Sequence, residues 1–577
     1  MKNKTGYPSI DNTHLKNVSY FKKNPIIPNM SVYDSLVMLS KFYKEDCAID
    51  CLNLKISYDK LIDNSVTISK AFKELGVKKG DIITVSMPNF YQAVAIFLAA
   101  NRIGAITTFI NSYSNIEEVK HYLNLFESSL FTNFDKNKAY NEQIKKSTKV
   151  KNIITLSRMD INKEKFNPDK EMGYDDFISF NDLQSVSKYY KKIINPYKSK
   201  NNDSLILFTS GSTGNPKSVV LTNENILASG IYLKNSSNLK PVRNEKCLVC
   251  VPFAYPYGFA TSTLLTLLCG RTAILGPDLN KDNISYYLSK NPNIIFGSPA
   301  LLEMIMRNVN EKQDLSSVHT FISGGDFLTP AQQEKGENFF KKHNSDVEMS
   351  NGSGNAETVG AGTNHYGIKI KPDTVGKVLT GSYPIIIDPE TFEEKKYNEE
   401  GTLCVSGKNV FKEYYKEPEL TKKAKFEYNG KTYFNTGTNG ILYEDGYFKL
   451  TGRASRFFIM STLNKVYLDH VQNAINMIDI VDECAVIEQE DQDLLFVPKA
   501  YVVLKENIKD LDMARDYILE KCKNAISNGN SILELKQYEI PSDIEFIEEL
   551  PRKSGTEKID YNYLKNLNKK VKTKTFK

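Results

Sequence analysis

The stretch that decides the fold is Thr209-Ser210-Gly211-Ser212-Thr213-Gly214-Asn215-Pro216-Lys217. An apolar run at 205–208 precedes it and an alternating run at 219–222 follows, so we predict a tight loop between two strands. The small residues of the loop expose backbone N–H groups and hydroxyls with little steric cover, and Lys217 follows within reach. A polyphosphate needs these groups. The alternative is a flexible Gly/Ser linker, but linkers rarely join two apolar strand runs with a lysine so placed.

Pro216 distinguishes this loop from the common mononucleotide-binding loop. That pattern places a glycine directly before the lysine, whereas Pro216 stands there and offers no N–H. We therefore expect an anion-binding loop that belongs to another nucleotide-binding family.

Length and charge limit the class of protein. The chain has 577 residues, which predicts about three or four structural units and favours a multidomain enzyme. Its 75 Lys and Arg residues against 69 Asp and Glu residues give a net charge of only +6, mixed along the chain, so we expect no nucleic-acid partner.

We expect neither a targeting segment nor a membrane segment in this sequence. Residues 1–12 lack the apolar core of a signal peptide, and Asn101 and Arg102 break the apolar run at 94–110. We predict a cytoplasmic protein with no stable membrane insertion. The eight cysteines form neither a disulfide framework nor a zinc pattern, and Cys247 and Cys250 are predicted to be core thiols within a strand at 246–253.

Helical and strand patterns alternate on both sides of the loop. Residues 58–75 have helical spacing, with Ser57 as a cap and Gly76 as the stop. Further on, the predicted strands are 82–87, 105–110 and 130–133, and the predicted helices between them are 90–103 and 116–126. After the loop, the predicted helices are 224–232, 259–269, 284–289 and 299–309, and the predicted strands are 248–251, 272–275 and 294–297. Two mostly parallel sheets covered by helices are the economical interpretation.

Two glycine clusters follow short predicted strands at 320–322 and 347–349. The first is Ser323-Gly324-Gly325-Asp326, and the second is Asn351-Gly352-Ser353-Gly354-Asn355-Ala356-Glu357. Ligands of open α/β sheets lie beyond the carboxyl ends of the strands, so both clusters can face one crevice together with the loop. Glu357 could hold a divalent ion on phosphates, or it could be an exposed turn carboxylate.

The character of the chain changes near residue 401, where short strands and turns begin at 402–406, 433–436, 441–444 and 447–451. We predict an N-terminal domain at 1–452, which includes a β-rich subdomain at about 380–452. The remainder, 453–577, is predicted to be a small α+β domain with strands near 485–487 and 500–504 and a helix at 511–524.

Taken together, these residues resemble the superfamily of AMP-forming acyl- and aryl-CoA synthetases, which also includes luciferases and peptide-synthetase adenylation domains. The resemblance runs from about residue 50 to 564, and the loop at 209–217 matches the family's phosphate loop almost letter for letter. The weaker matches, in the family's order, are 252–258 to its aromatic gate, 323–325 and 351–357 to its adenine motif, 436–440 to its ribose motif, Gly452-Arg453 to its hinge motif and 550–558 to its terminal lysine motif.

The resemblance implies a two-step ligase that uses ATP, Mg²⁺ and the thiol of coenzyme A or of a carrier-protein phosphopantetheine. A carboxylic acid attacks the α-phosphate of ATP and expels pyrophosphate, and the thiol then attacks the acyl adenylate. By resemblance, Thr209, Ser210 and Lys217 hold the β- and γ-phosphates and Glu357 holds the Mg²⁺. Arg453 binds the ribose, and Lys558 contacts the α-phosphate. The small C-terminal domain is implied to be mobile and to rotate about Ser455 between the steps.

The residues implied by resemblance fall into three groups. The catalytic group is Lys558, Thr209 and Glu357. The residues expected to bind the nucleotide are Thr209, Ser210, Gly211, Ser212, Thr213, Gly214, Lys217, Gly324, Gly325, Asn351, Gly352, Ser353, Gly354, Ala356, Thr438 and Arg453. The residues expected to line the substrate pocket are Phe253, Tyr255, Tyr257, Gly258 and Ser298.

Several positions depart from the family pattern. Ser353 replaces the aromatic residue that stacks on adenine, Ala356 replaces a threonine, and Thr438 replaces the aspartate that accepts both ribose hydroxyls. Losing that aspartate alone removes about 1.5–3 kcal/mol, or about tenfold to a hundredfold in ATP affinity. Leu463 and Glu557 stand where glycines are expected, and the segment 552–558 is one residue longer than the family pattern. These departures leave a second hypothesis open, namely a degenerate nucleotide- or acyl-binding relative with a regulatory or interaction role.

The only indication of the substrate class is an acidic residue that the sequence lacks. Amino-acid-activating relatives place an aspartate beside the aromatic gate, whereas residues 253–259 contain no acidic side chain. We therefore expect a small-molecule carboxylic acid that is apolar or aromatic. The acceptor is coenzyme A or an acyl carrier protein.

Overall fold

The structure is a computed structural model. It describes residues 4–16, 18–112, 114–156, 178–209, 216–237, 243–277, 279–325, 328, 330–453, 456–459, 465–491, 495–505, 508, 510–524, 526–528, 531–533, 535, 537–553 and 559–567.

The first sheet has eight strands in the order β20-β9-β8-β4-β3-β5-β6-β7. Its strands are β3 (Ile82–Ser86), β4 (Ile106–Phe109), β5 (Leu130–Phe134), β6 (Asn152–Leu156), β7 (Ile178–Ser179), β8 (Asp203–Phe208), β9 (Ser218–Thr222) and β20 (Glu413–Tyr414). The strands from β8 to β7 in this order run parallel, whereas β9 is antiparallel to both β8 and β20. The predicted βαβαβ unit and the predicted strand pair around the loop are confirmed.

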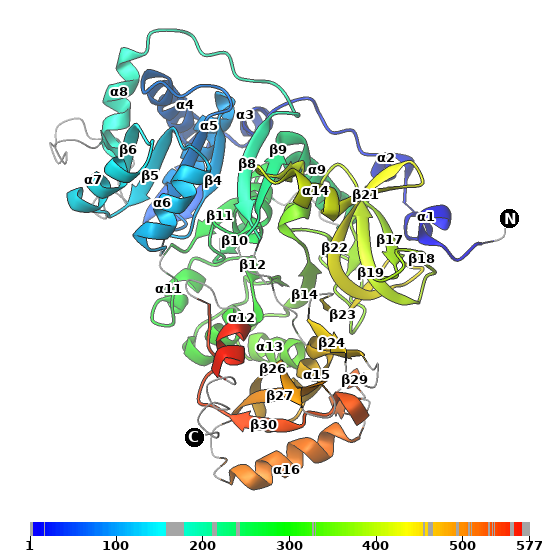
Figure 1. Cartoon of the computed structure of the whole chain (residues 1–577). Coiled ribbons are helices and arrows are strands. Elements are labelled where there is room, and N and C mark those ends of the chain that lie inside the picture. The colour runs from blue at the N-terminus through cyan, green and yellow to red at the C-terminus, as the bar shows by residue number, and fades with distance from the viewer. Residues whose placement is uncertain are drawn as a thin grey trace.

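Helices cover this sheet, as Figure 1 shows. They include α4 (Tyr58–Glu74), α5 (Tyr91–Arg102), α6 (Ile116–Leu125), α7 (Lys138–Ser147) and α8 (Leu183–Tyr189). The side chain of Ser57 accepts a hydrogen bond from Lys60 N, so the predicted cap of α4 is confirmed. Every residue of α5 is buried, because this helix packs in the core that the two large sheets share.

The second sheet has nine strands in the order β16-β15-β14-β13-β12-β10-β11-β1-β2. They are β1 (Cys47–Cys51), β2 (Leu54–Ser57), β10 (Lys246–Val249), β11 (Thr272–Leu275), β12 (Ile294–Gly297), β13 (Thr320–Ser323), β14 (Glu348–Ser353), β15 (Thr363–Asn364) and β16 (Lys377–Val378). The six strands from β14 to β1 are parallel. The hairpin β1–β2 comes from the N-terminal part of the chain and was not predicted.

Of the helices around the second sheet, those at 223–236, 257–268, 284–288 and 299–308 begin near the predicted positions, whereas those at 32–43 and 330–342 were not predicted. The full set is α3 (Val32–Tyr43), α9 (Asn223–Ser236), α11 (Ile284–Leu288), α12 (Pro299–Asn308) and α13 (Pro330–Lys342), together with the π-helix η4 (Tyr257–Leu264) and its continuation α10 (Leu265–Leu268). The apolar helix predicted at 259–269 thus starts two residues earlier. Cys250 follows β10 instead of lying in it and is only half-buried, so the prediction of two core thiols holds for Cys247 alone.

A six-stranded β subdomain follows. It contains β17 (Tyr383–Ile387), β18 (Glu394–Lys395), β19 (Glu400–Ser406), β21 (Lys425–Tyr428), β22 (Lys431–Leu442) and β23 (Phe448–Arg453), with α14 (Pro418–Ala424) beside it. The strands predicted at 433–436 and 441–444 form one long strand, β22, because the chain between them stays in the sheet. The short helices α1 (Pro8–Asp11) and α2 (Tyr20–Lys23), with the turn η1 (Thr13–Leu15), lie near this subdomain in Figure 1, and Ser9 Oγ donates to Glu394.

The C-terminal part has its own core, built around Val471, Val486 and Ile518. Its elements are β24 (Phe457–Ile459), β25 (Lys465–Tyr467), α15 (Leu468–Asn476), β26 (Val481–Asp491), β27 (Leu495–Leu504), α16 (Leu511–Cys522), β28 (Ile526–Asn528), β29 (Ser531–Leu533) and β30 (Asp543–Phe546). It lies next to α12 and α13, at the lower end of the molecule in Figure 1. Arg307 of α12 bonds to both carboxylate oxygens of Asp482 at 3.1 and 2.9 Å. The small α+β unit is thus confirmed, while the boundary at residue 452 stays a prediction.

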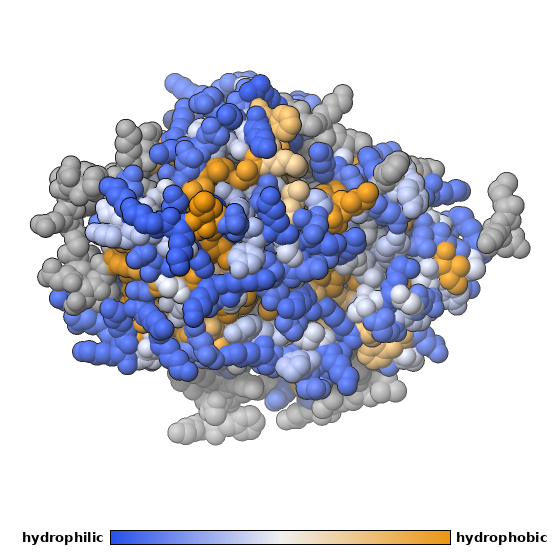
Figure 2. Space-filling model, turned by 90° about the horizontal axis from the view of Figure 1, so that it is seen from above, coloured by the Kyte–Doolittle hydropathy of each residue, from blue (hydrophilic) through white to orange (hydrophobic). Residues whose placement is uncertain are grey.

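Hydrophilic side chains dominate the face seen in Figure 2, and the hydrophobic residues there form separate patches. None of the helices in the described ranges is long and apolar enough to cross a bilayer.

Candidate active site

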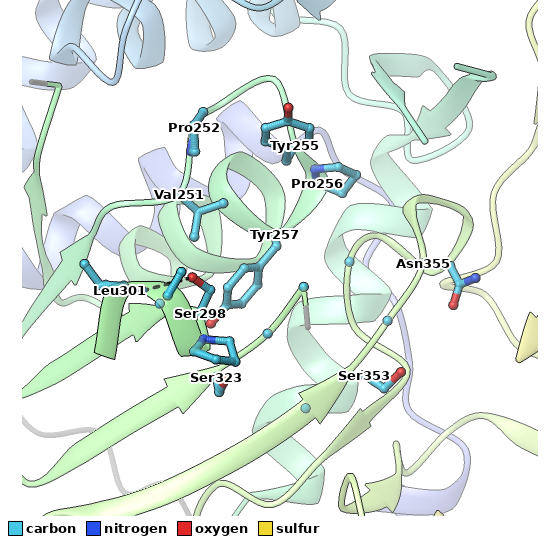
Figure 3. Close-up of a pocket in the computed structure, with 18 of the residues that line it drawn as sticks. Val251, Pro252, Tyr255, Pro256, Tyr257, Ser298, Leu301, Ser323, Ser353 and Asn355 are labelled. Atoms are coloured by element: carbon cyan, nitrogen blue, oxygen red, sulfur yellow. Dashed lines mark hydrogen bonds between the residues drawn. The ribbon is translucent and has the colours of Figure 1, made fainter. Parts of the chain in front are cut away.

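One large cavity of about 1950 Å³ lies beyond the carboxyl ends of β12, β13 and β14, the edge at which parallel sheets bind ligands. The π-helix η4, the strand β22 and the C-terminal domain complete its wall. Figure 3 shows Tyr257 reaching from η4 toward Ser298 and Ser323, with Ser353 and Asn355 on the other side of the space.

The two ends of the phosphate-loop stretch close on each other at the cavity wall. Thr209 N donates to Lys217 O at 3.0 Å, and Lys217 N donates to Thr209 Oγ1 at the same distance. Thr209 and Lys217 therefore continue the antiparallel pairing of β8 and β9 by one more step, and both line the cavity. The other predicted loop residues, Ser210, Gly211, Ser212, Thr213 and Gly214, lie outside the described residues.

Glu357 is buried, so its interpretation as an exposed turn carboxylate is wrong. Only 5% of this residue is exposed, and Tyr414 Oη donates to its Oε1 at 2.6 Å. The ammonium of Lys217 lies 5.2 Å from the centre of the same Tyr414 ring. Burial raises the pKa of Glu357 above its usual range, while the hydrogen bond from Tyr414 and the charge of Lys217 oppose that rise.

The two glycine clusters meet at the cavity as the sequence predicts, with one exception. Gly324, Gly325, Gly352, Ser353, Gly354 and Ala356 line it. Asn351, a described residue, does not line the cavity. It lies within β14, which extends through Ser353, and its side-chain amide forms two hydrogen bonds with the backbone of Leu328, at 2.8 and 3.2 Å. This predicted nucleotide contact is therefore a structural anchor.

The predicted ribose motif forms a bulge in β22. Leu403 of β19 faces Thr438, whereas the next residue, Cys404, faces Asn435, so Thr436 and Gly437 are extra residues on the β22 side. Gly437 has a φ of +64°, which favours glycine, and Asn355 Nδ2 donates to Thr436 O at 3.0 Å. The bulge carries Thr438 to the cavity wall. The backbone of Arg453 pairs with Thr438, but the Arg453 side chain, Ser455 and Lys558 lie outside the described residues, as do Leu463 and Glu557.

The predicted substrate-pocket residues differ in what they do. Tyr257 Oη donates to Ile322 O at 2.6 Å, and burial raises the pKa of Tyr255 to about 12. Ser298 caps α12 by accepting from Leu301 N at 3.3 Å, and it also lines the cavity. Gly258 does not line the cavity in the described part of the chain. A Cβ there would lie 2.3 Å from Pro252 O, so this glycine permits the close approach of η4 to the loop before it.

Phe253 is mainly a core residue. It is 2% exposed, and its ring centre lies 5.9 Å from that of Phe109 and 5.1 Å from that of Phe259. It is nevertheless among the residues that line the cavity.

The residues at the cavity that the sequence did not single out include Tyr414, Arg456 and Tyr561. The guanidinium of Arg456 lies 3.7 Å from the centre of the Tyr561 ring and donates to Val486 O at 2.8 Å. Arg456 lies three residues beyond the hinge motif Gly452-Arg453, which was the available signal for it, whereas Tyr414 has no local signature because its partner Glu357 is 57 residues away.

The donor set near Glu357 suits a divalent ion that also binds phosphate. Among the described residues, no group of three His, Cys, Asp or Glu side chains is placed to hold a metal. A single buried carboxylate next to a phosphate loop fits Mg²⁺, which typically takes one or two carboxylates together with substrate phosphates and waters.

Comparison with known families settles the class of this site. The pattern of the AMP-binding enzyme family matches residues 41–415, and that of the AMP-binding enzyme C-terminal domain matches residues 470–558. The chain belongs to the AMP-binding enzyme family. It is accordingly an adenylate-forming ligase of the acyl-CoA synthetase type, as the sequence motifs predict, and the non-catalytic alternative is not favoured.

Named relatives agree with this class. A probable 4-coumarate–CoA ligase 2 of Dictyostelium discoideum is 26% identical over 77% of this chain and 80% of the relative. A long-chain-fatty-acid–CoA ligase of Bacillus subtilis is 24% identical over 91% of this chain and 92% of the relative.

Solved structures share the fold. ATP-bound MatB from Rhodopseudomonas palustris has a TM-score of 0.79 at 21% identity and covers 94% of this chain and 99% of its own. The anthranilate CoA ligase AuaEII in complex with anthranoyl-AMP has a TM-score of 0.80 at 20% identity, covering 95% of this chain and 99% of its own. The two α/β sheets with a smaller α+β domain are thus confirmed as the family fold.

Proposed function

We propose that this chain joins an apolar carboxylic acid to coenzyme A in two steps, with Mg·ATP as the energy source and Glu357 as the metal ligand. The observation that carries the proposal is the constellation of Glu357, Tyr414 and Lys217 at the end of the phosphate-loop stretch, on the wall of one large cavity. These groups supply one buried anion and one cation at the same wall, which is the combination that a metal-bound triphosphate needs.

In the first step, an oxygen of the substrate carboxylate forms a bond to the α-phosphorus of ATP, and the bond from that phosphorus to the bridging oxygen of pyrophosphate breaks. Lys217 and Thr209 hold the β- and γ-phosphate oxygens, where negative charge gathers as pyrophosphate leaves. Bound Mg²⁺ would neutralise part of that charge. Lys558 is assigned to the α-phosphate, because a fixed cation there stabilises the transition state in a site that excludes water.

In the second step, the sulfur of coenzyme A attacks the acyl carbon, the acyl–oxygen bond to AMP breaks, and the thiol proton leaves with solvent. Rotation of the C-terminal domain about Ser455 takes Lys558 away and admits the thiol. The bond from Arg307 to Asp482 permits such movement, because Arg307 is 58% exposed and exposed ion pairs contribute only about 0–1 kcal/mol.

The choice of an apolar acid rests on the wall around Tyr257. Val251, Phe296 and Leu301 line this part of the cavity, and no carboxylate lies between Val251 and Phe259 to pair with an ammonium group. The choice of coenzyme A over a carrier protein rests on the named relatives, which are described as CoA ligases.

The test is carboxylate-dependent exchange of labelled pyrophosphate into ATP, measured with the purified chain and a panel of acids. We expect exchange that requires both an acid and Mg²⁺ and that falls strongly in Glu357→Gln. A chain that binds ATP without any acid-dependent exchange would be the degenerate relative instead.

A further inference from the structure

The cavity continues past Tyr257 into an arm between α9 and the helical pair η4 and α10. Its wall includes Leu233, Ser237, Thr261, Leu265 and Asn364. Tyr257 and Thr266, which are nine positions apart along η4 and α10, both line the cavity, so the arm follows this helical stretch. This arm starts at the predicted gate residues, so it is the part of the cavity that can receive the acyl chain.

The far end of the arm carries a buried cation. Arg271 precedes β11, lines the cavity and is only 5% exposed. Its Nε lies 2.5 Å from Glu245 Oε2, and His319 Nε2 lies 3.2 Å from the other oxygen of Glu245. Tyr366, which is 9% exposed, lines the same end, and the charge of Arg271 lowers the otherwise raised pKa of its hydroxyl.

The polar groups along the arm differ in whether they have hydrogen-bond partners within the protein. Asn364 Nδ2 donates to Ser237 Oγ at 3.1 Å, Ser237 Oγ donates to Leu233 O at 2.8 Å, and Thr266 Oγ1 donates to Ser262 O at 2.6 Å. By contrast, Arg271 Nε is buried and, within the described ranges, its only polar contact is the ion pair with Glu245 Oε2; no hydrogen bond of the described residues involves the two terminal nitrogens of Arg271 or the hydroxyl of Tyr366.

An arginine nitrogen can only donate, so the group that completes this end must be an acceptor. We propose that Arg271 and Tyr366 form an oxygen-binding subsite at the end of the acyl arm, and that the preferred substrate is a carboxylic acid with a neutral hydroxyl or carbonyl oxygen at its far end. This inference rests on the proposed ligase function, and it assigns the substrate class of that same site.

The charge balance favours a neutral oxygen over a second carboxylate. Glu245 already pairs with Arg271, and its pKa is lowered by His319 and Arg271 despite its burial, so the pair is neutral overall. A second carboxylate would have to leave water and share the one guanidinium with Glu245, and desolvating an ion without a full counter-charge is unfavourable by several kcal/mol.

The experiment compares matched acids in the pyrophosphate-exchange assay. Straight-chain acids of increasing length are tested against the same acids with a terminal hydroxyl, methyl ketone or carboxylate. At the length that spans the arm, we expect kcat/KM for the hydroxyl or ketone acid to exceed that of the plain acid by about tenfold or more, the value of one hydrogen bond to a charged donor.

Two variants test the assignment of residues. Tyr366→Phe removes one donor and should reduce the preference several-fold. The pair Arg271→Met with Glu245→Gln removes both charges together, so neither is left unpaired, and it should bring the preference close to one.

The matched control is Lys290→Met with Asp50→Asn. This variant removes another buried ion pair, with side chains 13% and 7% exposed, outside the residues that line the cavity. It should lower the melting temperature comparably and leave the preference unchanged.

Three results would overturn the subsite. They are equal or better use of the plain acid by the parent protein, a preference for the dicarboxylate, and a preference that survives loss of Arg271 and Glu245. If no acid supports exchange, the ligase proposal fails instead. Calorimetry of the same acids without ATP then tests the subsite separately, because the oxygenated acid should still bind more tightly than the plain one.

Discussion

The replacement Tyr414→Phe removes a single hydroxyl that connects Glu357 to the phosphate end of the site. Tyr414 Oη donates to Glu357 Oε1 at 2.6 Å, and the ring, which the variant keeps, lies 5.2 Å from the Lys217 ammonium. The change therefore isolates the hydrogen bond to the carboxylate from the packing around it.

The size of the effect follows from the burial of Glu357. A hydrogen bond to a charged group contributes about 1.5–3 kcal/mol, and water cannot replace it at a residue that is 5% exposed. We expect the free energy of unfolding to fall by about that amount. Because a group that orients a metal ligand typically affects metal affinity by about tenfold to a hundredfold, the Mg²⁺ concentration for half-maximal activity should rise by that factor.

The assays are urea unfolding without ligands and a Mg²⁺ titration of acid-dependent pyrophosphate exchange. Tyr415→Phe is the matched control, because it removes the same atom from the next residue, whose ring packs 5.3 Å from that of Phe126. If the two variants give the same Mg²⁺ dependence, Tyr414 does not position Glu357 and the reasoning is wrong.

Four further changes test other parts of the account. Lys217→Ala should weaken the use of ATP and pyrophosphate with little change in melting temperature, and a sharp fall in that temperature would show a structural lysine instead. Lys558→Ala should slow adenylation by about a hundredfold to a thousandfold, while thiol transfer from supplied acyl adenylate stays near the parent rate. Equal loss of rate in both steps would exclude the rotating-domain account. Loss of rate in neither step would make Lys553 the next candidate. Ser353→Tyr with Thr438→Asp should tighten ATP binding in calorimetry, and unchanged affinity would mean that the nucleotide wall has been remodelled. His365 is fully buried, and this burial lowers its pKa to about 4. Below about pH 6.5 the unfolded chain therefore binds more protons than the folded chain, and the free energy of unfolding falls as the pH drops from 6.5 to 4. His365→Gln should remove about 3 kcal/mol of that loss in unfolding curves across this range, and an unchanged pH slope would contradict the assignment.

Local sequence patterns predicted the helices and strands that pack against segments close to them in the chain. Ser57 is both the sequence cap and the observed cap of α4, and the alternation from β3 to β5 fixed a parallel sheet because short crossovers allow few other arrangements. The loop from Thr209 to Lys217 was recognised as a strand connection for the same reason.

Contacts between distant segments could not be predicted. The strand β1 pairs with β11 through Ile49 and Ala273, and nothing in the apolar run near residue 49 specifies that edge of the second sheet. Tyr414 reaches Glu357 only because β20 pairs with β9 next to the loop.

Within the motifs, the residue types alone did not predict the direction in which each side chain points. Asn351 belongs to a glycine cluster at the cavity but bonds to Leu328 instead, and Arg271 resembles an ordinary charged turn residue until its burial is known. The roles of Arg453, Ser455 and Lys558, the domain boundary at residue 452 and the cytoplasmic location stay predictions.

The most direct measurement is the isolation of the intermediate from the parent protein. The chain is incubated with Mg·ATP and an accepted acid in the absence of thiol, quenched, and examined by mass spectrometry for acyl adenylate, while pyrophosphate is counted. We predict one acyl adenylate and one pyrophosphate per active site, followed by release of AMP and thioester when coenzyme A is added. Formation of ADP and phosphate, or of no acyl adenylate with any acid that binds, would contradict the account.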